Sequence, residues 1–356
     1  MATFPSLSHD GSLPPKVQED KREADPTLAQ GISEYSDLIS TLPLDKGWEP
    51  YLLRKYQGFW IAEYILPGII ALQQHFKACH SDLFLMSYPK SGTTWLKALA
   101  FATINRNRYQ FADHPLLSHN PHDCIPLIDI DFASKIKDTP SPRILQSHAP
   151  YSLLPDSIKA SDCRIIYVFR DAKDVFVSDW FFFNRLRRSN GLEPIPFGKA
   201  FELFCEGVCS YGPIWDHVLE YWEESLRRPE KVLFLNYEEM LADPAGNVKR
   251  LAKFMGCPFS TDEEKEGVVE EIVRLCSFEK LKNLEVNKRS KFVLPNVKFD
   301  NESYFRKGEV GDWRNHMSLE MALRLDGIIQ EKLRGTSLTF GGVGDSDSSH
   351  HQQLSS

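Results

Sequence analysis

The chain has 356 residues, of which 42% are hydrophobic and 26% are charged, an ordinary composition for a globular protein. This composition excludes a chain that is disordered throughout, a collagen-like chain and a coiled coil, and the length is sufficient to fold without disulfides. The formal net charge of -7 excludes a bulk binder of nucleic acid or anionic membranes, so an anionic ligand would need a local cluster of cations and backbone N–H groups.

The two ends of the chain are polar and differ from its centre. Residues 1–30 contain Pro, Ser and acidic residues, and residues 339–356 are rich in Gly, Ser and Asp. Both are therefore expected to be flexible tails around one domain at 31–338. The start has no apolar secretory segment and is too acidic for a transit peptide, and the apolar run at 64–72 is too short to span a bilayer. The seven cysteines form no CxxC pair. We expect a soluble, cytoplasmic protein.

Between the tails, short apolar runs alternate with longer helical patterns. In chain order we expect a strand at 82–88, a helix from Thr93, strands at 143–147 and 164–169, a helix ending near Arg188, one or two amphipathic helices within 197–227, a strand at 231–237 and a helix starting at Asp243-Pro244. Strands separated by helices predict an α/β fold, here a single domain with a mostly parallel central sheet flanked by helices. Ligands of such sheets bind at the carboxyl ends of the strands.

The loop after the first strand has the composition of an anion-binding turn. It reads Lys90, Ser91, Gly92, Thr93, Thr94 and Trp95. Gly92 would allow close approach of the backbone, the N–H groups of the loop would converge at a helix N-terminus, and Lys90 would add a mobile positive charge. The loop is not a Walker A motif, because its lysine precedes its glycine. The alternative interpretation is a structural strand-turn-helix connection with an exposed lysine.

Polar residues at the other strand ends could complete an anion site. Arg170 follows the third expected strand and could bind a phosphate, with Ser178 donating from the next helix. A surface pair between Arg170 and Asp171 is the alternative. Tyr237 ends the fourth expected strand, and its hydroxyl could reach the same cleft. His148 follows the second expected strand and could act as a general base, because the ordinary pKa of histidine lies near neutrality.

A second pair of cations lies far along the chain. Arg306 and Lys307 precede Gly308 and could form another anion-binding loop. A charge run of this kind is usually a solvated face. The aromatic residues on both sides, YF before and GDW after, favour instead a loop that packs on the core.

Three segments, in this order and spacing, resemble the cytosolic sulfotransferase family: YPKSGTTWL, IIYVFRDAKDVFVS and FRKGEVGDW. The segments QGFW, HPLL and NPHD are similar to the plant branch of that family, and the resemblance covers roughly residues 45–335. It implies a single α/β domain that is P-loop-kinase-like, here a sulfotransferase domain at 31–338. It also implies 3′-phosphoadenosine 5′-phosphosulfate (PAPS) as the donor, whose sulfonate group is moved onto a hydroxyl or an amine.

The resemblance implies roles for individual residues. The loop from Lys90 to Trp95 would hold the 5′-phosphosulfate, with Lys90 neutralising charge on the bridging oxygen, and His148 would take the proton of the acceptor. The 3′-phosphate would be bound by Arg170, Ser178, Arg306, Lys307 and Gly308. The adenine would contact four side chains: Trp95 and Phe278 on its faces, and Tyr237 and Cys276 at its edge.

Two residues depart from the family pattern. Animal members carry a lysine two residues before the histidine, where this chain has Gln146, so any transition-state role of that lysine is missing or supplied elsewhere. Cys276 stands where the family usually has Thr, and a thiol is a weaker hydrogen-bond donor. The animal dimer motif is not recognisable after the Arg306 to Gly308 segment, so we expect a monomer or a weak dimer.

Together these observations predict a sulfotransferase that uses PAPS and no metal. Its acceptor would be a hydroxyl of a small, largely apolar metabolite of the flavonoid, steroid, hydroxyjasmonate or desulfoglucosinolate class, with no nucleic acid or membrane as partner. PAPS carries roughly four negative charges, and four cations of the predicted site would match them: Lys90, Arg170, Arg306 and Lys307. The alternatives are a small-molecule or nucleotide kinase, which would require Mg²⁺ and ATP, and a non-catalytic nucleotide-binding protein.

Overall fold

The computed structural model describes residues 35–131, 143–289, 291–294 and 297–340. The tail expected at 1–30 lies outside these residues, and so does the tail expected at 339–356 apart from its first two residues. The second of these, Phe340, is buried, and its ring lies 5.9 Å from the ring of Phe169. The packed core therefore includes residue 340.

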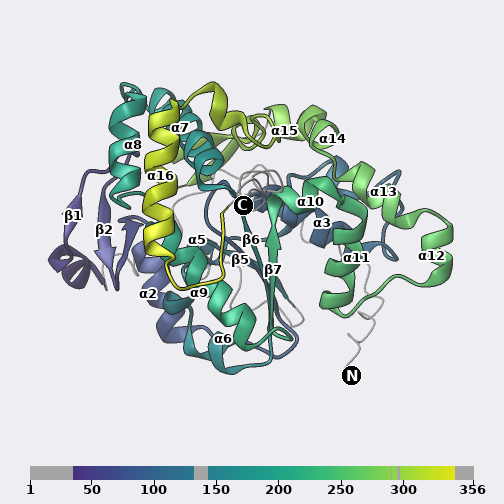
Figure 1. Cartoon of the computed structure of the whole chain (residues 1–356). Helices are drawn as coiled ribbons and strands as arrows, with labels where there is room; N and C mark the ends of the chain where they lie inside the picture. Colours follow the sequence, from purple (N-terminus) through teal and green to yellow (C-terminus); the bar gives the residue numbers. More distant parts are fainter. Residues whose placement is uncertain (1–34, 132–142, 290, 295–296, 341–356) are drawn as a thin grey trace, which may run out of the picture.

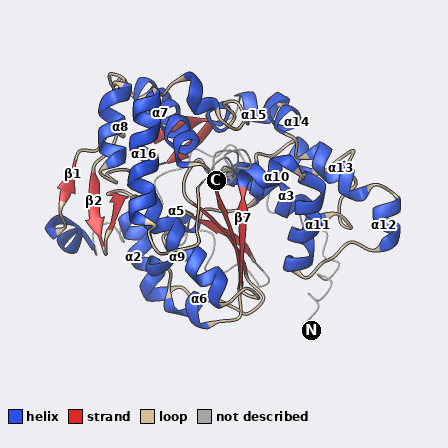
Figure 2. Cartoon of the chain, viewed as in Figure 1, coloured by secondary structure: helices blue, strands red, loops and turns tan. Residues whose placement is uncertain are grey.

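Four parallel strands form the centre of the molecule (Figures 1 and 2). They are β4 (Leu83–Ser87), β5 (Ile144–Ser147), β6 (Arg164–Phe169) and β7 (Val232–Asn236), and they pair in the order β5-β4-β6-β7. Each lies within one residue, at either end, of the strand that the sequence predicts. The predicted parallel sheet is confirmed.

The apolar runs of these strands bury both faces of the sheet. Phe84 and Met86 of β4 belong to one hydrophobic cluster, whereas Leu83 and Leu85 belong to the other. Successive side chains of a strand point to opposite faces, so a strand that is covered on both sides needs an unbroken apolar run. This explains why the sequence of β4 shows no alternation of polar and apolar residues.

Helices supply the cover on each face (Figure 1). The first cluster includes residues of α2 (Leu66–His75), α7 (Ala172–Ser189), α9 (Ile214–Arg227) and α16 (Leu319–Lys332). The second includes residues of α3 (Thr93–Asn105), α10 (Tyr237–Ala242), α11 (Pro244–Met255) and α13 (Val268–Leu275). Further helices are α4 (Pro121–Cys124), α5 (Ile128–Asp131), α6 (Asp156–Ala160), α8 (Phe197–Cys205), α12 (Thr261–Lys265), α14 (Phe278–Asn283) and α15 (Glu285–Arg289).

Local signals explain several helix ends. The Asp171 side chain accepts a hydrogen bond from the backbone N–H of Lys173 and begins α7. Asp243 caps α11 in the same way, and this helix start was predicted. The segment 197–227 forms two helices, α8 and α9. Gly207, with a φ of 77°, and Pro213, the N-cap of α9, lie in the connection between them.

Two antiparallel elements were not expected from the sequence. A three-stranded sheet contains β1 (Leu44–Asp45), β2 (Leu53–Tyr56) and β3 (Phe59–Ala62), and a hairpin contains β8 (Lys291–Leu294) and β9 (Val297–Asp300). The turn between β2 and β3 is Gln57-Gly58, and both residues have positive φ angles. A two-residue turn of this kind is a hairpin signal that the sequence does contain.

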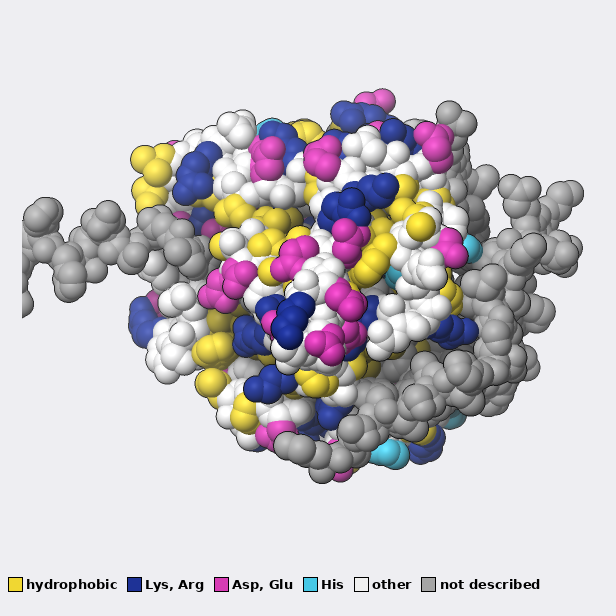
Figure 3. Space-filling view, turned by 90° about the vertical axis from the view of Figure 1, so that its right-hand side faces the viewer, with side chains coloured by type: hydrophobic (Ala, Val, Ile, Leu, Met, Phe, Trp, Pro, Cys, Tyr) yellow, Lys and Arg dark blue, Asp and Glu magenta, His cyan; other side chains and the backbone are white. Residues whose placement is uncertain are grey.

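On the face shown in Figure 3, positive and negative side chains are interspersed, and neither sign forms a continuous patch. Within the described part of the chain, no helix is long and apolar enough to cross a bilayer.

The contact between α2 and α5 leaves no space for a side chain at Gly68. A Cβ atom there would lie 1.9 Å from the carbonyl oxygen of Asp129. We expect Gly68→Ala to lower the free energy of unfolding by about 1–3 kcal/mol, because the backbone of α5 would have to move. Gly327 lies in α16 with nothing within 4 Å of such an atom, so Gly327→Ala should raise the free energy of unfolding by about 0.5–1 kcal/mol. Urea unfolding measures both, and equal stability of the two variants would contradict this packing.

Candidate active site

A cavity of about 350 Å³ lies where the four parallel strands end. It is lined by residues that follow β4, β5, β6 and β7 directly, as expected for ligands of a parallel sheet. Of the predicted site residues, these line it: Lys90, Gly92, Thr93, Thr94, Trp95, His148, Arg170, Ser178, Tyr237, Cys276, Phe278, Arg306, Lys307 and Gly308. Ser91 does not: it is buried, and its N–H donates to the carbonyl of Tyr88 at 3.3 Å.

The loop between β4 and α3 is held tightly by its neighbours. Gly92 is the N-cap of α3 with a φ of 109°, and a Cβ atom there would lie 2.6 Å from the Tyr237 ring. The Thr93 hydroxyl is hydrogen bonded to the Ser87 hydroxyl at 2.6 Å. Only glycine fits both this conformation and this close approach. Gly92 and the first three residues of α3 line the cavity beside Tyr237.

Lys90 projects from this loop into an aromatic and cationic environment. Its ammonium lies 4.1 Å from the centre of the Phe182 ring. Burial lowers the pKa of Lys90; Asp179 opposes this effect, and the guanidinium groups of Arg306 and Arg170 add to it. An anion in the cavity would relieve the repulsion between these cations.

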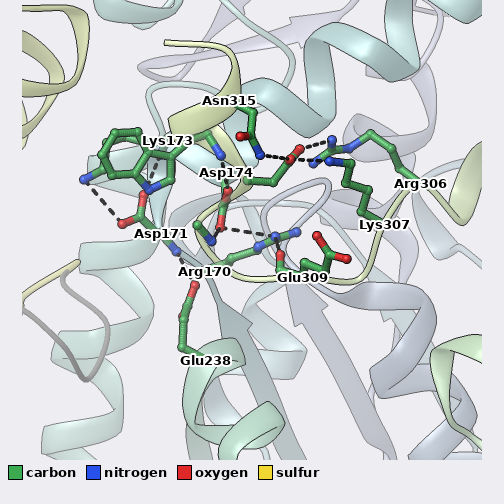
Figure 4. Close-up of polar contacts among 12 residues, drawn as sticks. Arg170, Asp171, Lys173, Asp174, Glu238, Arg306, Lys307, Glu309 and Asn315 are labelled. Carbon is green, nitrogen blue, oxygen red and sulfur yellow. Dashed lines mark hydrogen bonds and ion pairs between the residues drawn. The ribbon is translucent and has the colours of Figure 1, made fainter. Parts of the chain in front are cut away.

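Arg170 leaves the end of β6 and is buried rather than on the surface. Its Nη2 atom donates to the carbonyl of Glu309 at 2.6 Å and lies 3.3 Å from the Asp174 carboxylate (Figure 4). Its guanidinium also lies 4.6 Å from the centre of the Tyr237 ring. Asp171 is engaged in capping α7, so a surface pair between Arg170 and Asp171 is wrong. The Nε atom of Arg170 has no protein partner in the described part of the chain.

The segment that carries Arg306 and Lys307 packs on the core, as predicted. Both cations pair with Asp312, which is 3% exposed. Figure 4 shows Arg306 and Lys307 side by side, near Asn315. Burial alone would raise the pKa of Asp312, but the hydrogen bonds from these two cations hold it well below its usual range. Gly308 has a φ of 70°, and a Cβ atom there would lie 2.5 Å from the Phe278 ring.

The buried carboxylates change the charge balance that the sequence suggested. Arg170 pairs with Asp174, and Arg306 and Lys307 share Asp312, so two negative charges lie among the four predicted cations. A count of cations therefore overstates the positive charge of the cavity. The carboxylates instead fix the cations in place before a ligand arrives, which is the usual purpose of such partners.

His148 follows β5 and is oriented by its own hydrogen bonds. Its Nδ1 atom lies 2.8 Å from the carbonyl oxygen of Ser87. A carbonyl only accepts, so Nδ1 carries the proton and Nε2 keeps its lone pair. Burial lowers the pKa of His148 to about 3, with Lys97 among the neighbours that add to this effect. The ring is thus neutral at pH 7 and able to accept a proton at Nε2.

The backbone around His148 is fixed by residues that the sequence did not single out. Its N–H donates to Asp129 at 2.9 Å, and its carbonyl accepts from Nε2 of His217 at 2.8 Å. Asp129 also accepts from the hydroxyl groups of Ser147 and Tyr211, at 2.5 and 2.8 Å. No local motif marks Asp129 or His217, because their role depends on contacts between distant segments.

The rest of the cavity is aromatic and apolar. Its lining includes Tyr51, Tyr64, Phe182, Phe183, Tyr211 and Tyr304. Gln146 also lines it; this side chain is fully buried, and neither amide atom has a protein partner in the described residues. Cys276 is buried, and burial raises the pKa of its thiol. The Trp95 ring meets the Tyr237 ring edge-on at 5.7 Å.

Comparison with known proteins agrees with this geometry. Residues 80–337 match the family model of the sulfotransferase domain. Cytosolic sulfotransferase 16 of Arabidopsis thaliana is 46% identical over 86% of this chain and 92% of that protein, and flavonol 4′-sulfotransferase of Flaveria chlorifolia is 48% identical over 81% and 90%.

Two solved structures have the same fold. A sulphotransferase of Arabidopsis thaliana has a TM-score of 0.69 and 38% identity, over 89% of this chain and 98% of that one. A mouse sulfotransferase complexed with PAP has a TM-score of 0.62 and 30% identity, over 80% and 96%. The predicted P-loop-kinase-like α/β fold is confirmed by these neighbours. The chain is a sulfotransferase, and it belongs to the cytosolic sulfotransferase family of plants.

Proposed function

We propose that this protein transfers the sulfonate group of PAPS to a hydroxyl group of a small, largely apolar metabolite in the cytoplasm. The observation that carries the proposal is that two clusters of anion-binding residues line one cavity. The loop from Lys90 to Trp95 forms the first, and Arg170 with the Arg306 to Gly308 segment forms the second. A nucleotide with phosphates on both its 3′ and 5′ positions would occupy both clusters at once.

The relatives support both the nucleotide and the location. The mouse sulfotransferase was solved with PAP, adenosine 3′,5′-bisphosphate, which is PAPS without its sulfonate group. The relatives from Arabidopsis are named cytosolic. In this chain the 3′-phosphate would be bound by Arg170, Ser178, Arg306, Lys307 and Gly308. Trp95 and Phe278 would lie on the two faces of the adenine, with Tyr237 and Cys276 at its edge.

The residues of the chain would carry the reaction as follows. PAPS, when bound, supplies the sulfonate group and leaves as PAP. His148 would accept the hydroxyl proton at Nε2 while the acceptor oxygen bonds to sulfur and the bond from sulfur to the phosphate oxygen breaks. Lys90 and the N–H groups at the start of α3 would stabilise the negative charge that develops on that phosphate oxygen. The products would be PAP and a sulfate ester, with the proton on His148.

The aromatic half of the cavity supports a flat, hydroxylated acceptor. Tyr51, Phe182, Phe183 and Tyr304 would enclose rings rather than charged groups. Two relatives are named flavonol sulfotransferases, at 48% and 45% identity. A flavonoid fits these observations, and steroids, hydroxyjasmonates and desulfoglucosinolates complete the panel of apolar acceptors to test with radiolabelled PAPS.

Arg170→Met tests the 3′-phosphate site. Loss of a charged hydrogen-bond donor should weaken PAP binding by about 10- to 100-fold and leave adenosine 5′-phosphate within about threefold. Isothermal titration calorimetry measures both nucleotides, and Arg188→Met, at an exposed position of α7, is the matched control. An equal loss for both nucleotides would show that Arg170 does not recognise the 3′-phosphate.

His148→Asn tests the general base. Removal of the proton acceptor should lower kcat by about 100- to 10,000-fold, whereas the affinity for PAP should stay within about threefold. The control is His119→Asn, because His119 is exposed. Transfer from radiolabelled PAPS gives kcat, and calorimetry gives PAP affinity. A variant with near wild-type kcat would exclude His148 as the base.

The pH profile follows from the lowered pKa of His148. Burial disfavours the imidazolium form, so the neutral base stays populated well below pH 6.5 in the enzyme without nucleotide. The ratio kcat/KM reports the ionisation of the free enzyme. We therefore expect kcat/KM at pH 6.5 to stay well above half of its maximum value. Initial rates at pH 5.5 to 8.5 measure this. An acid limb centred near pH 6.5 that disappears in His148→Asn would contradict the buried environment.

A further inference from the structure

A chain of three polar side chains leads from a buried lysine to the loop that begins α3. Lys97 is fully buried, and its ammonium donates to the carbonyl of Ile125 at 3.0 Å and lies 3.1 Å from Nδ1 of His122. The other ring nitrogen, Nε2 of His122, lies 2.9 Å from the Thr94 hydroxyl. Lys97, His122 and Thr94 all line the cavity.

The chemistry of these groups fixes the direction of the chain. An ammonium group only donates, so Nδ1 of His122 accepts and Nε2 carries the proton. That N–H donates to the oxygen of Thr94. The Thr94 hydroxyl proton is then left to donate into the cavity, where the loop would hold the 5′-phosphosulfate. Each donor thus points away from the buried cation and toward the anion.

The position of the His122 ring is set on several sides. It stacks on the Tyr304 ring with centroids 4.1 Å apart. Its backbone N–H donates to the Asn120 side chain at 2.8 Å, within the capping box of α4. Burial and the adjacent Lys97 charge keep the pKa of His122 well below its ordinary value, so the ring stays neutral. A neutral, fixed ring can both accept and donate.

The hydrogen-bonded chain from Lys97 to Thr94 lies in a site where position 146 carries no positive charge. Gln146, two residues before His148, is neutral, and its amide atoms have no protein partner in the described residues. Lys97 is a buried cation close enough to act on the pKa of both His148 and Asp129. The positive charge of Lys97 therefore lies close to His148, and it is linked to the Thr94 hydroxyl through the His122 ring.

We propose that Lys97 and His122 are positioning residues that hold the Thr94 hydroxyl as a donor to the sulfonate group, in place of a cation at position 146. The proposal rests on the proposed function, because it assumes PAPS in the cavity. Hydrogen bonds in a chain polarise one another, so a cation at its far end strengthens the donor at its near end. In this proposal the Thr94 hydroxyl contacts the sulfonate group, which PAP lacks.

Variants of His122 test the chain in the complete enzyme. His122→Phe keeps a ring against Tyr304 but removes both hydrogen bonds, and we expect kcat to fall about 10- to 100-fold. His122→Gln keeps one acceptor and one donor and should recover a large part of that loss. PAP affinity should stay within about threefold in both. His119→Phe, at an exposed position of the same segment, is the matched control.

A double-mutant cycle separates this role from simple packing. Thr94→Val removes the last hydroxyl of the chain and leaves Lys97 and His122 paired. This variant therefore tests the proposal even if His122→Phe folds poorly. In the Thr94→Val background, His122→Phe should cause no further loss of kcat, because both changes break one chain. An equal loss in both backgrounds would overturn the proposal.

The tautomer of His122 gives a readout that does not depend on activity. In protein labelled with ¹⁵N-histidine, with the His122 signals assigned by their absence in His122→Gln, we expect a neutral ring protonated at Nε2 between pH 6 and 8. A proton on Nδ1 would overturn the proposal even if transfer is fast. By contrast, a wild-type enzyme with the expected tautomer but no sulfonate transfer would contradict the proposed function and not this geometry.

Discussion

The arrangement of the site depends on the buried carboxylate of Asp174. It accepts the backbone N–H groups of Gly311 and Trp313, at 2.7 and 3.0 Å, and lies 3.3 Å from the Arg170 guanidinium (Figure 4). A buried carboxylate without partners is strongly unfavourable, and these three donors together offset that cost. Through them, one residue in the first turn of α7 holds a distant loop of the chain against the end of β6.

The carboxylates of Asp174 and Asp312 fix the positions of the cations that would bind an anionic ligand. Asp174 and Asp312 hold Arg170, Arg306 and Lys307 in fixed positions, so the ligand meets oriented donors rather than mobile side chains. Fixed dipoles and charges of this kind need no rearrangement when negative charge develops. The Nε atoms of Arg170 and Arg306 have no hydrogen-bond partner in the described part of the chain, so both are free to donate to a ligand. The overall net charge of -7 is compatible with this, because binding is decided locally.

The parts of the fold that could be predicted are those whose signal is local. The strands of the parallel sheet are short apolar runs, and Asp243 with Pro244 marks the start of α11. The loop from Lys90 to Trp95 and the Arg306 to Gly308 segment were found as motifs, and the cavity brings them together. Ser91 was the exception, because the sequence cannot show that its N–H turns back to Tyr88.

The parts that could not be predicted depend on contacts between distant segments. Asp129 and His217 fix the backbone of His148, yet neither lies in a recognisable motif. Asp312 follows Lys307 by five residues, but only the folded loop shows that it neutralises part of the cation cluster. Lys97 lies on α3 among apolar neighbours, where a sequence pattern gives no reason to expect a partner such as His122.

In the proposed function, the loop from Lys90 to Trp95 and the cations Arg170, Arg306 and Lys307 bind the two phosphate ends of one adenine nucleotide. A crystal structure of the protein grown with PAP tests this most directly. We predict the 3′-phosphate within hydrogen-bond distance of Arg170, Ser178 and the Arg306 to Gly308 segment, and the 5′-phosphate at the start of α3. A nucleotide bound in the reverse orientation, or outside this cavity, would contradict the account.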